Sequence, residues 1–142
     1  MGTILFNNNG ISPSLKYKPF LKIFLTSIFA EEGYDFKSVS YIFCTDEYLL
    51  KLNQKYLKHD TLTDIITFTL SETSFPIISE IYISVERVKE NSLKLDETYE
   101  TEMQRVMIHG ILHLCGYSDH TPELKIKMRA KEDYYLARMN FN

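Results

Sequence analysis

The feature that most restricts the fold of this chain is a cluster of histidines in its C-terminal third. Three of the four histidines lie in the segment HGILHLCGYSDH, which runs from His109 to His120. Histidines four residues apart, such as His109 and His113, share one face of an α-helix and stand about 6 Å apart along its axis. Gly116 favours a left-handed end to that helix, after which the chain can reverse. The segment therefore predicts a helix that ends in a tight turn beside its own imidazoles.

Two imidazoles on one helical face, with a third donor from the following turn, match the donor set of a zinc site. A pair of histidines at this spacing is more often an incidental helix face, but the third histidine and the intervening glycine favour a metal. The sequence predicts one Zn²⁺ held by His109, His113 and His120. Three protein ligands leave a fourth position for water, and Asp119 is an alternative third ligand because zinc also accepts carboxylate oxygen.

Gly110 distinguishes this segment from the zinc protease pattern His-Glu-x-x-His. In that pattern the glutamate after the first histidine is the general base. Gly110 occupies this position here, which makes peptide hydrolysis an unattractive interpretation. A glycine inside a helix instead indicates that another element packs closely against the backbone.

The apolar pattern of the whole chain predicts an α+β fold with a small mixed β-sheet of about four strands and about five helices, the metal site lying on a central helix. Strands are expected over residues 3–6, 38–44, 64–70 and 80–85, the last two pairing as a hairpin. Helices are expected over residues 14–32, 45–56, 84–93, 98–115 and 121–138. Thr45 and Thr121 are predicted N-caps, and Gly33 and Gly116 are predicted helix stops.

Length and composition favour one compact domain over residues 1–142. The chain has 142 residues and 44% hydrophobic content, enough for a sizeable core. Two distant cysteines, Cys44 and Cys115, and no basic-then-apolar leader favour a cytoplasmic location. The longest apolar stretch, around 20–30, is too short and too polar to span a bilayer, so no membrane partner is expected.

The net charge of −3 counts against a protein that coats nucleic acid non-specifically. An enzyme acting on RNA would need a local basic surface, although a short run of cations is more often an ordinary solvated helix face. The candidate cations form two groups, Lys51, Lys55 and Lys58, and Lys125, Lys127, Arg129 and Lys131.

The histidine segment resembles a motif of the YbeY family, His-Gly-x-Leu-His-Leu-x-Gly-Tyr-Asp-His. The resemblance extends upstream, where the family carries Leu-Asn-x-x-Tyr-Arg-x-x-Asp-x-Pro-Thr-Asp-Val-Leu-Ser-Phe and then Asp-Ile-x-Ile-Ser. The matching residues here are Leu52, Asn53, Tyr56, Asp60, Thr63, Asp64 and Phe68, followed by the segment 81–86. The similarity covers residues 46–138.

The resemblance implies a single-strand-specific endoribonuclease that acts in ribosomal RNA maturation and ribosome quality control. Its partners would be precursor ribosomal RNA and the ribosome or ribosomal proteins, and its site would lie in a cleft between the sheet and the histidine-bearing helix. The expected chemistry is metal-assisted phosphodiester cleavage, in which zinc polarises a phosphoryl oxygen or supplies a bound hydroxide. The expected catalytic residues are His109, Asp119 and Lys58, with the strand from Thr63 to Leu70 as a wall of the cleft.

This chain departs from the family pattern at three positions. The family places five residues between its second and third histidines, whereas six lie between His113 and His120. We favour Ser118 as a loop insertion, which keeps His120 as the ligand; in the alternative, Asp119 takes the third ligand's spacing. The family's arginine falls on Leu57, so Lys55 or Lys58 would have to meet the phosphate as a point charge. The family's proline falls on Leu62.

Two other functions stay open from the sequence. One is a ribosome-associated RNA-binding module with a structural zinc, closed by a fourth ligand from Asp119 or Cys115. Cys115 lies two residues after His113, about 200° around the helix, so we expect it to be buried elsewhere. The other is a metal-dependent hydrolase of peptides or small phosphoesters.

Overall fold

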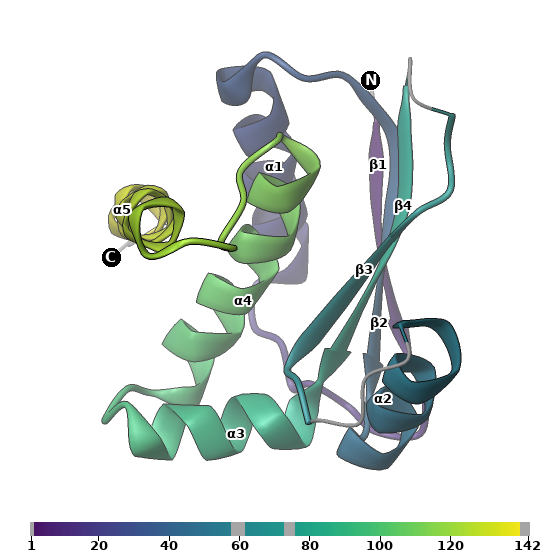
Figure 1. Ribbon diagram of the computed structural model, residues 1–142. Coiled ribbons are helices and arrows are strands. Elements are labelled where there is room, and N and C mark those ends of the chain that lie inside the picture. Colours follow the sequence, from purple (N-terminus) through teal and green to yellow (C-terminus); the bar gives the residue numbers. More distant parts are fainter. Residues whose placement is uncertain (1, 58–61, 73–75, 140–142) are drawn as a thin grey trace.

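The computed structural model describes residues 2–57, 62–72 and 76–139 (Figure 1). Its elements in chain order are β1 (Thr3–Asn8), α1 (Lys18–Glu32), β2 (Phe36–Cys44), α2 (Asp46–Leu52), the π-helical turn η1 (Asn53–Leu57), β3 (Ile65–Thr69), β4 (Ile77–Ser84), α3 (Val85–Lys94), α4 (Tyr99–Leu114) and α5 (Pro122–Arg138).

The strands form one mixed sheet in the order β1-β2-β4-β3. β1 pairs with β2, and β2 with β4, in parallel, whereas β3 and β4 are antiparallel neighbours, as the predicted hairpin requires. In Figure 1, α1, α4 and α5 lie on one side of the sheet, and α2 lies near the opposite side. The α+β fold class is therefore confirmed, with α4 as a central helix.

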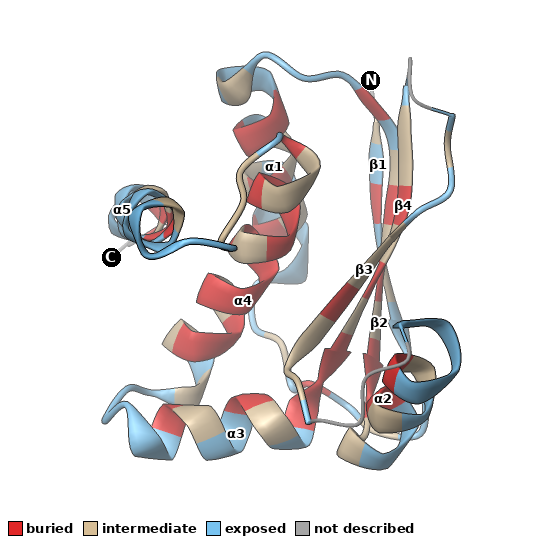
Figure 2. Cartoon of the chain, viewed as in Figure 1, coloured by how far each residue is buried: buried red, intermediate tan, exposed pale blue. Residues whose placement is uncertain are grey.

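Alternation along the strands separates two apolar clusters, because successive side chains of a strand point to opposite faces. The larger cluster joins the sheet to α1 and α4 and includes Tyr41, Ile81 and Met107. The smaller cluster is Cys44, Leu49 and Ile66, which α2 covers on the other face. Figure 2 shows the buried residues concentrated where α4 faces the sheet.

Gly110 lies where α4 contacts the sheet. A Cβ atom at this position would stand 3.0 Å from Ile81 Cδ1 and 3.1 Å from Ile65 Cδ1, closer than ordinary van der Waals contact. The expectation that an element packs closely on Gly110 is therefore confirmed. The Tyr41 hydroxyl also donates a 2.7 Å hydrogen bond from β2 to the Met107 carbonyl of α4. These contacts hold the histidine-bearing helix α4 close against the sheet.

The predicted N-caps and glycine helix stops are confirmed. The Thr45 and Thr121 side chains accept hydrogen bonds from the backbone N–H groups of Tyr48 and Leu124, as N-caps do. Gly33 and Gly116 adopt left-handed φ angles of 82° and 93° after their helices.

Several predicted boundaries are wrong. The helix expected from residue 14 begins only at Lys18, because Ser14 and Tyr17 have positive φ angles. The strand expected over 3–6 continues to Asn8, which pairs with Phe43 in β2. The strand expected over 80–85 begins at Ile77, which pairs with Phe36.

No helix among the described residues is both long and apolar enough to cross a membrane.

Candidate metal centre

His109, His113 and Asp119 form a compact group of possible metal ligands. The two histidines lie one turn apart on α4, and Asp119 lies in the loop that connects α4 to α5. One ligand atom from each residue falls within 4.8 Å of the other two. Asp119 Oδ2 is 3.5 Å from His109 Nε2 and 3.7 Å from His113 Nε2. Donors bound tetrahedrally to one zinc stand roughly 3.4 Å apart, so these residues fit a single metal ion.

His120 lies beside this group but is not one of its three residues. The side chain is exposed and lines the same cleft. The structure thus brings together the alternative ligand set, in which five residues lie between His113 and Asp119, and not the favoured set with His120. The chain reverses before both residues at Gly116, where the Tyr117 N–H donates to the Leu112 carbonyl at 3.0 Å.

The loop that carries Asp119 is held by a carboxylate at the end of α1. Glu32 Oε1 accepts a 2.8 Å hydrogen bond from the Tyr117 hydroxyl. Lys131 Nζ lies 3.1 Å from Glu32 Oε2, and the Tyr135 hydroxyl donates to the same oxygen. Burial acts to raise the pKa of Glu32, but these three donors outweigh it and lower the pKa. Tyr117 is therefore packed locally against the end of α1.

The Nδ1 atom of His109 forms a hydrogen bond with Glu132, an acidic residue of α5. This nitrogen lies 2.6 Å from Glu132 Oε2, and Glu132 Oε1 accepts a 3.2 Å hydrogen bond from Arg105. Burial opposes the charged form of His109, but the hydrogen bond and charge of Glu132 raise its pKa. Burial and the neighbouring His109 lower the pKa of His113. Sequence reasoning missed Glu132, because no spacing rule pairs α5 with α4.

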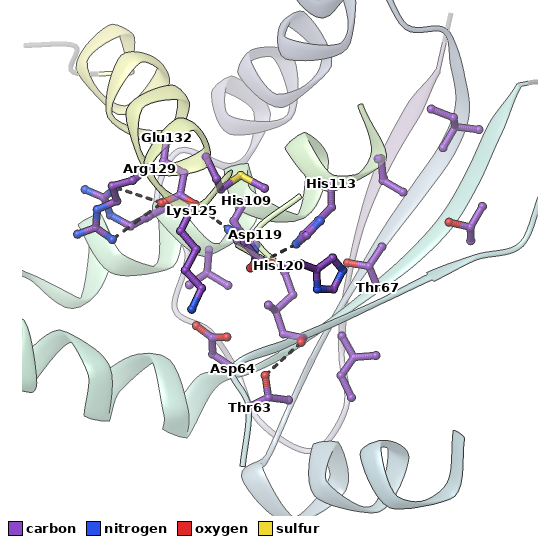
Figure 3. A pocket seen from close by; sticks show the side chains of 18 of the residues that line it. Thr63, Asp64, Thr67, His109, His113, Asp119, His120, Lys125, Arg129 and Glu132 are labelled. Carbon is purple, nitrogen blue, oxygen red and sulfur yellow. Dashed lines mark hydrogen bonds and ion pairs between the residues drawn. The ribbon is translucent and has the colours of Figure 1, made fainter. Parts of the chain in front are cut away.

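These side chains line a cleft of about 1270 Å³ between β3, α4 and α5 (Figure 3). The segment 63–67 and Thr69 form the wall on the sheet side, which confirms the predicted cleft wall for this part of the strand from Thr63 to Leu70. His109 and His113 face it from α4, and Lys125 and Arg129 line it from α5. The metal group is therefore open to a space large enough for an extended ligand.

Two further acids line the cleft. Burial raises the pKa of Asp64, which belongs to the segment that resembles the family. Burial and then the charge of Asp64 raise the pKa of Glu102. Within the described part of the chain, Glu102 Oε1 is buried without a hydrogen-bond partner.

Cys115 is buried away from the metal group, as expected. Its residue is 5% exposed, and burial raises the pKa of its thiol to about 12. Among residues 2–57, 62–72 and 76–139, the group of possible metal ligands is His109, His113 and Asp119, and no cysteine belongs to it. The donor set in this region is thus two imidazoles and one carboxylate.

The lysines of the first candidate group, Lys51, Lys55 and Lys58, differ in what the structure shows of them. Lys58, the expected catalytic lysine, lies outside the described residues, as does Asp60. Lys51 pairs with Glu47 at 3.4 Å, and Lys55 lies 5.2 Å from the centre of the Tyr56 ring. Leu57, at the family's arginine position, lines the cleft.

Comparison with known proteins identifies relatives over nearly the whole chain. The family model described as Endoribonuclease YbeY matches residues 7–140. A protein named Endoribonuclease YbeY from Cytophaga hutchinsonii is 42% identical over 139 residues, which are 98% of this chain and 97% of the relative. A protein of the same name from Flavobacterium psychrophilum is 47% identical over 112 residues, 79% of each chain.

A solved structure has the same fold. The solution structure of TM1509 from Thermotoga maritima matches with a TM-score of 0.67 and 32% sequence identity, covering 94% of this chain and 86% of that one. The family model covers most of the chain, and the two relatives are 42% and 47% identical to it. The chain belongs to the endoribonuclease YbeY family.

Proposed function

We propose that this protein is a zinc-dependent, single-strand-specific endoribonuclease that acts in ribosomal RNA maturation and ribosome quality control. The observation that carries the proposal is the group His109, His113 and Asp119 at the wall of an open cleft, in a chain of this family. The relatives' name states endoribonuclease activity for those proteins. A cytoplasmic location and ribosomal partners are part of the proposal.

We assign His109 Nε2, His113 Nε2 and Asp119 Oδ2 as the metal ligands. Both nitrogens face the same carboxylate oxygen, at 3.5 and 3.7 Å, and the side chains are partly exposed toward the cleft. When bound, the metal supplies Lewis acidity toward a phosphodiester and lowers the pKa of a coordinated water. Three ligands from this chain keep one side accessible to RNA and solvent, as hydrolytic zinc sites require.

Lys125 is the cation best placed to meet a phosphate of the RNA. Arg105, Lys125 and Arg129 line the cleft among the described cations. Arg105 pairs with Glu132 and Asp133, and Arg129 Nη1 lies 4.0 Å from Glu132. Lys125 is exposed and forms no ion pair with any residue that the structure describes. Figure 3 shows its side chain extending from α5 across the cleft.

Replacing Lys125 by alanine is expected to raise KM for single-stranded RNA about tenfold, since a charge-assisted contact to phosphate contributes roughly 1.5–3 kcal/mol. The matched control is Lys127→Ala, because Lys127 is exposed on the same helix but does not line the cleft. KM of both variants is measured from steady-state cleavage of single-stranded RNA at two salt concentrations. Equal KM values for the two variants would exclude Lys125 as the phosphate contact.

The function is tested by incubating zinc-loaded and chelator-treated protein with matched single-stranded and duplex RNA. We expect internal cleavage of the single strand by the loaded protein, little cleavage of the duplex, and recovery of activity when zinc is restored. Failure of a folded, zinc-replete sample to cut any RNA would instead support the binding module with a structural zinc. Undiminished cleavage after chelation would contradict metal dependence.

A further inference from the structure

Glu132 connects the metal centre to a buried ion-pair network between α4 and α5. The residue is 5% exposed. One carboxylate oxygen, Oε2, lies 2.6 Å from His109 Nδ1, and the other, Oε1, lies 3.2 Å from Arg105 Nη1. Arg105 and His109 are four residues apart, so they share one face of α4 and both reach the same carboxylate. Glu132 is therefore satisfied on both oxygens by side chains of one neighbouring helix.

The two ring nitrogens of His109 face different partners. Nδ1 faces Glu132, whereas Nε2 faces Asp119 Oδ2 at 3.5 Å. An ionised carboxylate can only accept hydrogen bonds, so a neutral His109 must carry its proton on Nδ1. Nε2 then keeps its lone pair directed at the metal group. The tautomer of His109 thus follows from its contact with Glu132.

Arg105 keeps the Glu132 carboxylate in place. Its residue is 8% exposed, and its Nη1 atom also lies 2.9 Å from Asp133 Oδ1. A buried carboxylate without a cation would be costly, so the ion pair with Arg105 stabilises Glu132 at this place between α4 and α5. Arg129 adds a weaker cation at 4.0 Å. These two arginines are the cations of the described chain that stand within ion-pair distance of Glu132.

We propose that Glu132 is a positioning residue for the metal: its carboxylate fixes the tautomer and the ring orientation of His109, so that Nε2 is the ligand atom. The proposal deepens the proposed function and rests on the metal site assigned there. Carboxylates that accept the second N–H of a ligating histidine typically contribute 10–100-fold in metal affinity. Glu132 is not one of the three grouped donors, so it acts through His109.

The competing explanation is purely structural, with Glu132 serving only to hold α5 against α4 through Arg105. That role would change the stability of the metal-free protein and leave its affinity for zinc unchanged once folded. Asp133 provides a matched control, because it contacts the same arginine but lies on the exposed side, with 59% side-chain exposure.

The experiment compares Glu132→Gln and Asp133→Asn with the wild type. The dissociation constant for zinc is measured by competition with a chromophoric chelator, at a temperature where thermal unfolding shows every metal-free variant folded. We expect Glu132→Gln to weaken zinc binding at least about tenfold and Asp133→Asn to stay within about twofold. Wild-type affinity in Glu132→Gln, with only a lower unfolding temperature, would overturn the positioning role.

A second measurement needs no variant to fold. In the zinc-loaded wild type, ¹⁵N chemical shifts of the imidazoles report which nitrogen of His109 carries the proton. A protonated Nδ1 with metal-bound Nε2 supports the proposal, and metal bound through Nδ1 overturns it. If the wild type binds no zinc, the proposed function fails together with this inference, whereas unaltered binding by Glu132→Gln removes this inference alone.

Discussion

Replacing His113 by alanine is expected to abolish stoichiometric zinc binding and to lower RNA cleavage about a thousandfold or more. His113 supplies one of three grouped donors, with Nε2 3.7 Å from Asp119 Oδ2. Two remaining ligands cannot hold the ion in the open arrangement that a hydrolytic site needs. The side chain is 30% exposed, so its truncation leaves only a small void and the fold should persist.

Zinc content of the purified variant, its far-ultraviolet circular dichroism and its cleavage of single-stranded RNA together test this expectation. A folded, zinc-free and inactive variant is the expected result. Chelated wild-type protein serves as the control, because it loses the metal without any change of sequence. Equal cleavage by the variant and the wild type would point to a contaminating nuclease and would remove the support for a metal-dependent reaction.

Helices were predictable here where local chemistry determines their ends. The threonine caps and Gly33 and Gly116 act within one turn of the chain, so the sequence alone indicates them. The beginning of α1 was not predictable from its apolar spacing. Tyr17 adopts a left-handed conformation immediately before the helix, which L-residues other than glycine seldom do.

Strand ends depended on partners far along the chain. Asn7 and Asn8 resemble a turn in sequence, yet they extend β1 because they lie opposite Ile42 and Phe43 of β2. Ile77 likewise joins β4 because β2 provides Phe36 as its neighbour. Propensity describes only the segment itself, whereas pairing depends on the whole sheet.

In the candidate site, too, some residues follow from local spacing and others only from contacts between distant helices. His109 and His113 follow from helical periodicity, and the grouped structure agrees with that spacing. Glu132 enters the site only because α5 crosses α4, and Lys125 is exposed to the cleft for the same reason. Sequence reasoning could name the cations of α5 but could not rank them. Ranking them required knowing which cations line the cleft and which of these already pair with acids.

The choice between Asp119 and His120 as third ligand is the sharpest remaining prediction. Five residues separate His113 from Asp119, and the structure places Asp119 within ligand distance of both histidines. We expect Asp119→Ala to weaken zinc binding about a hundredfold or more, since it removes one of three ligands. We expect His120→Ala to change the dissociation constant less than about threefold, because its ring lies outside the group.

Zinc titration of both variants decides the matter, and two further variants test the spacing itself. Asp119→His should retain tight binding, because an imidazole would then stand where five residues separate it from His113. Deleting Ser118 should rescue Asp119→Ala, because the deletion moves His120 into that same position. The reverse pattern, with His120→Ala losing zinc and Asp119→Ala keeping it, would show that Ser118 is an inserted residue and that the loop closes with His120 on the metal.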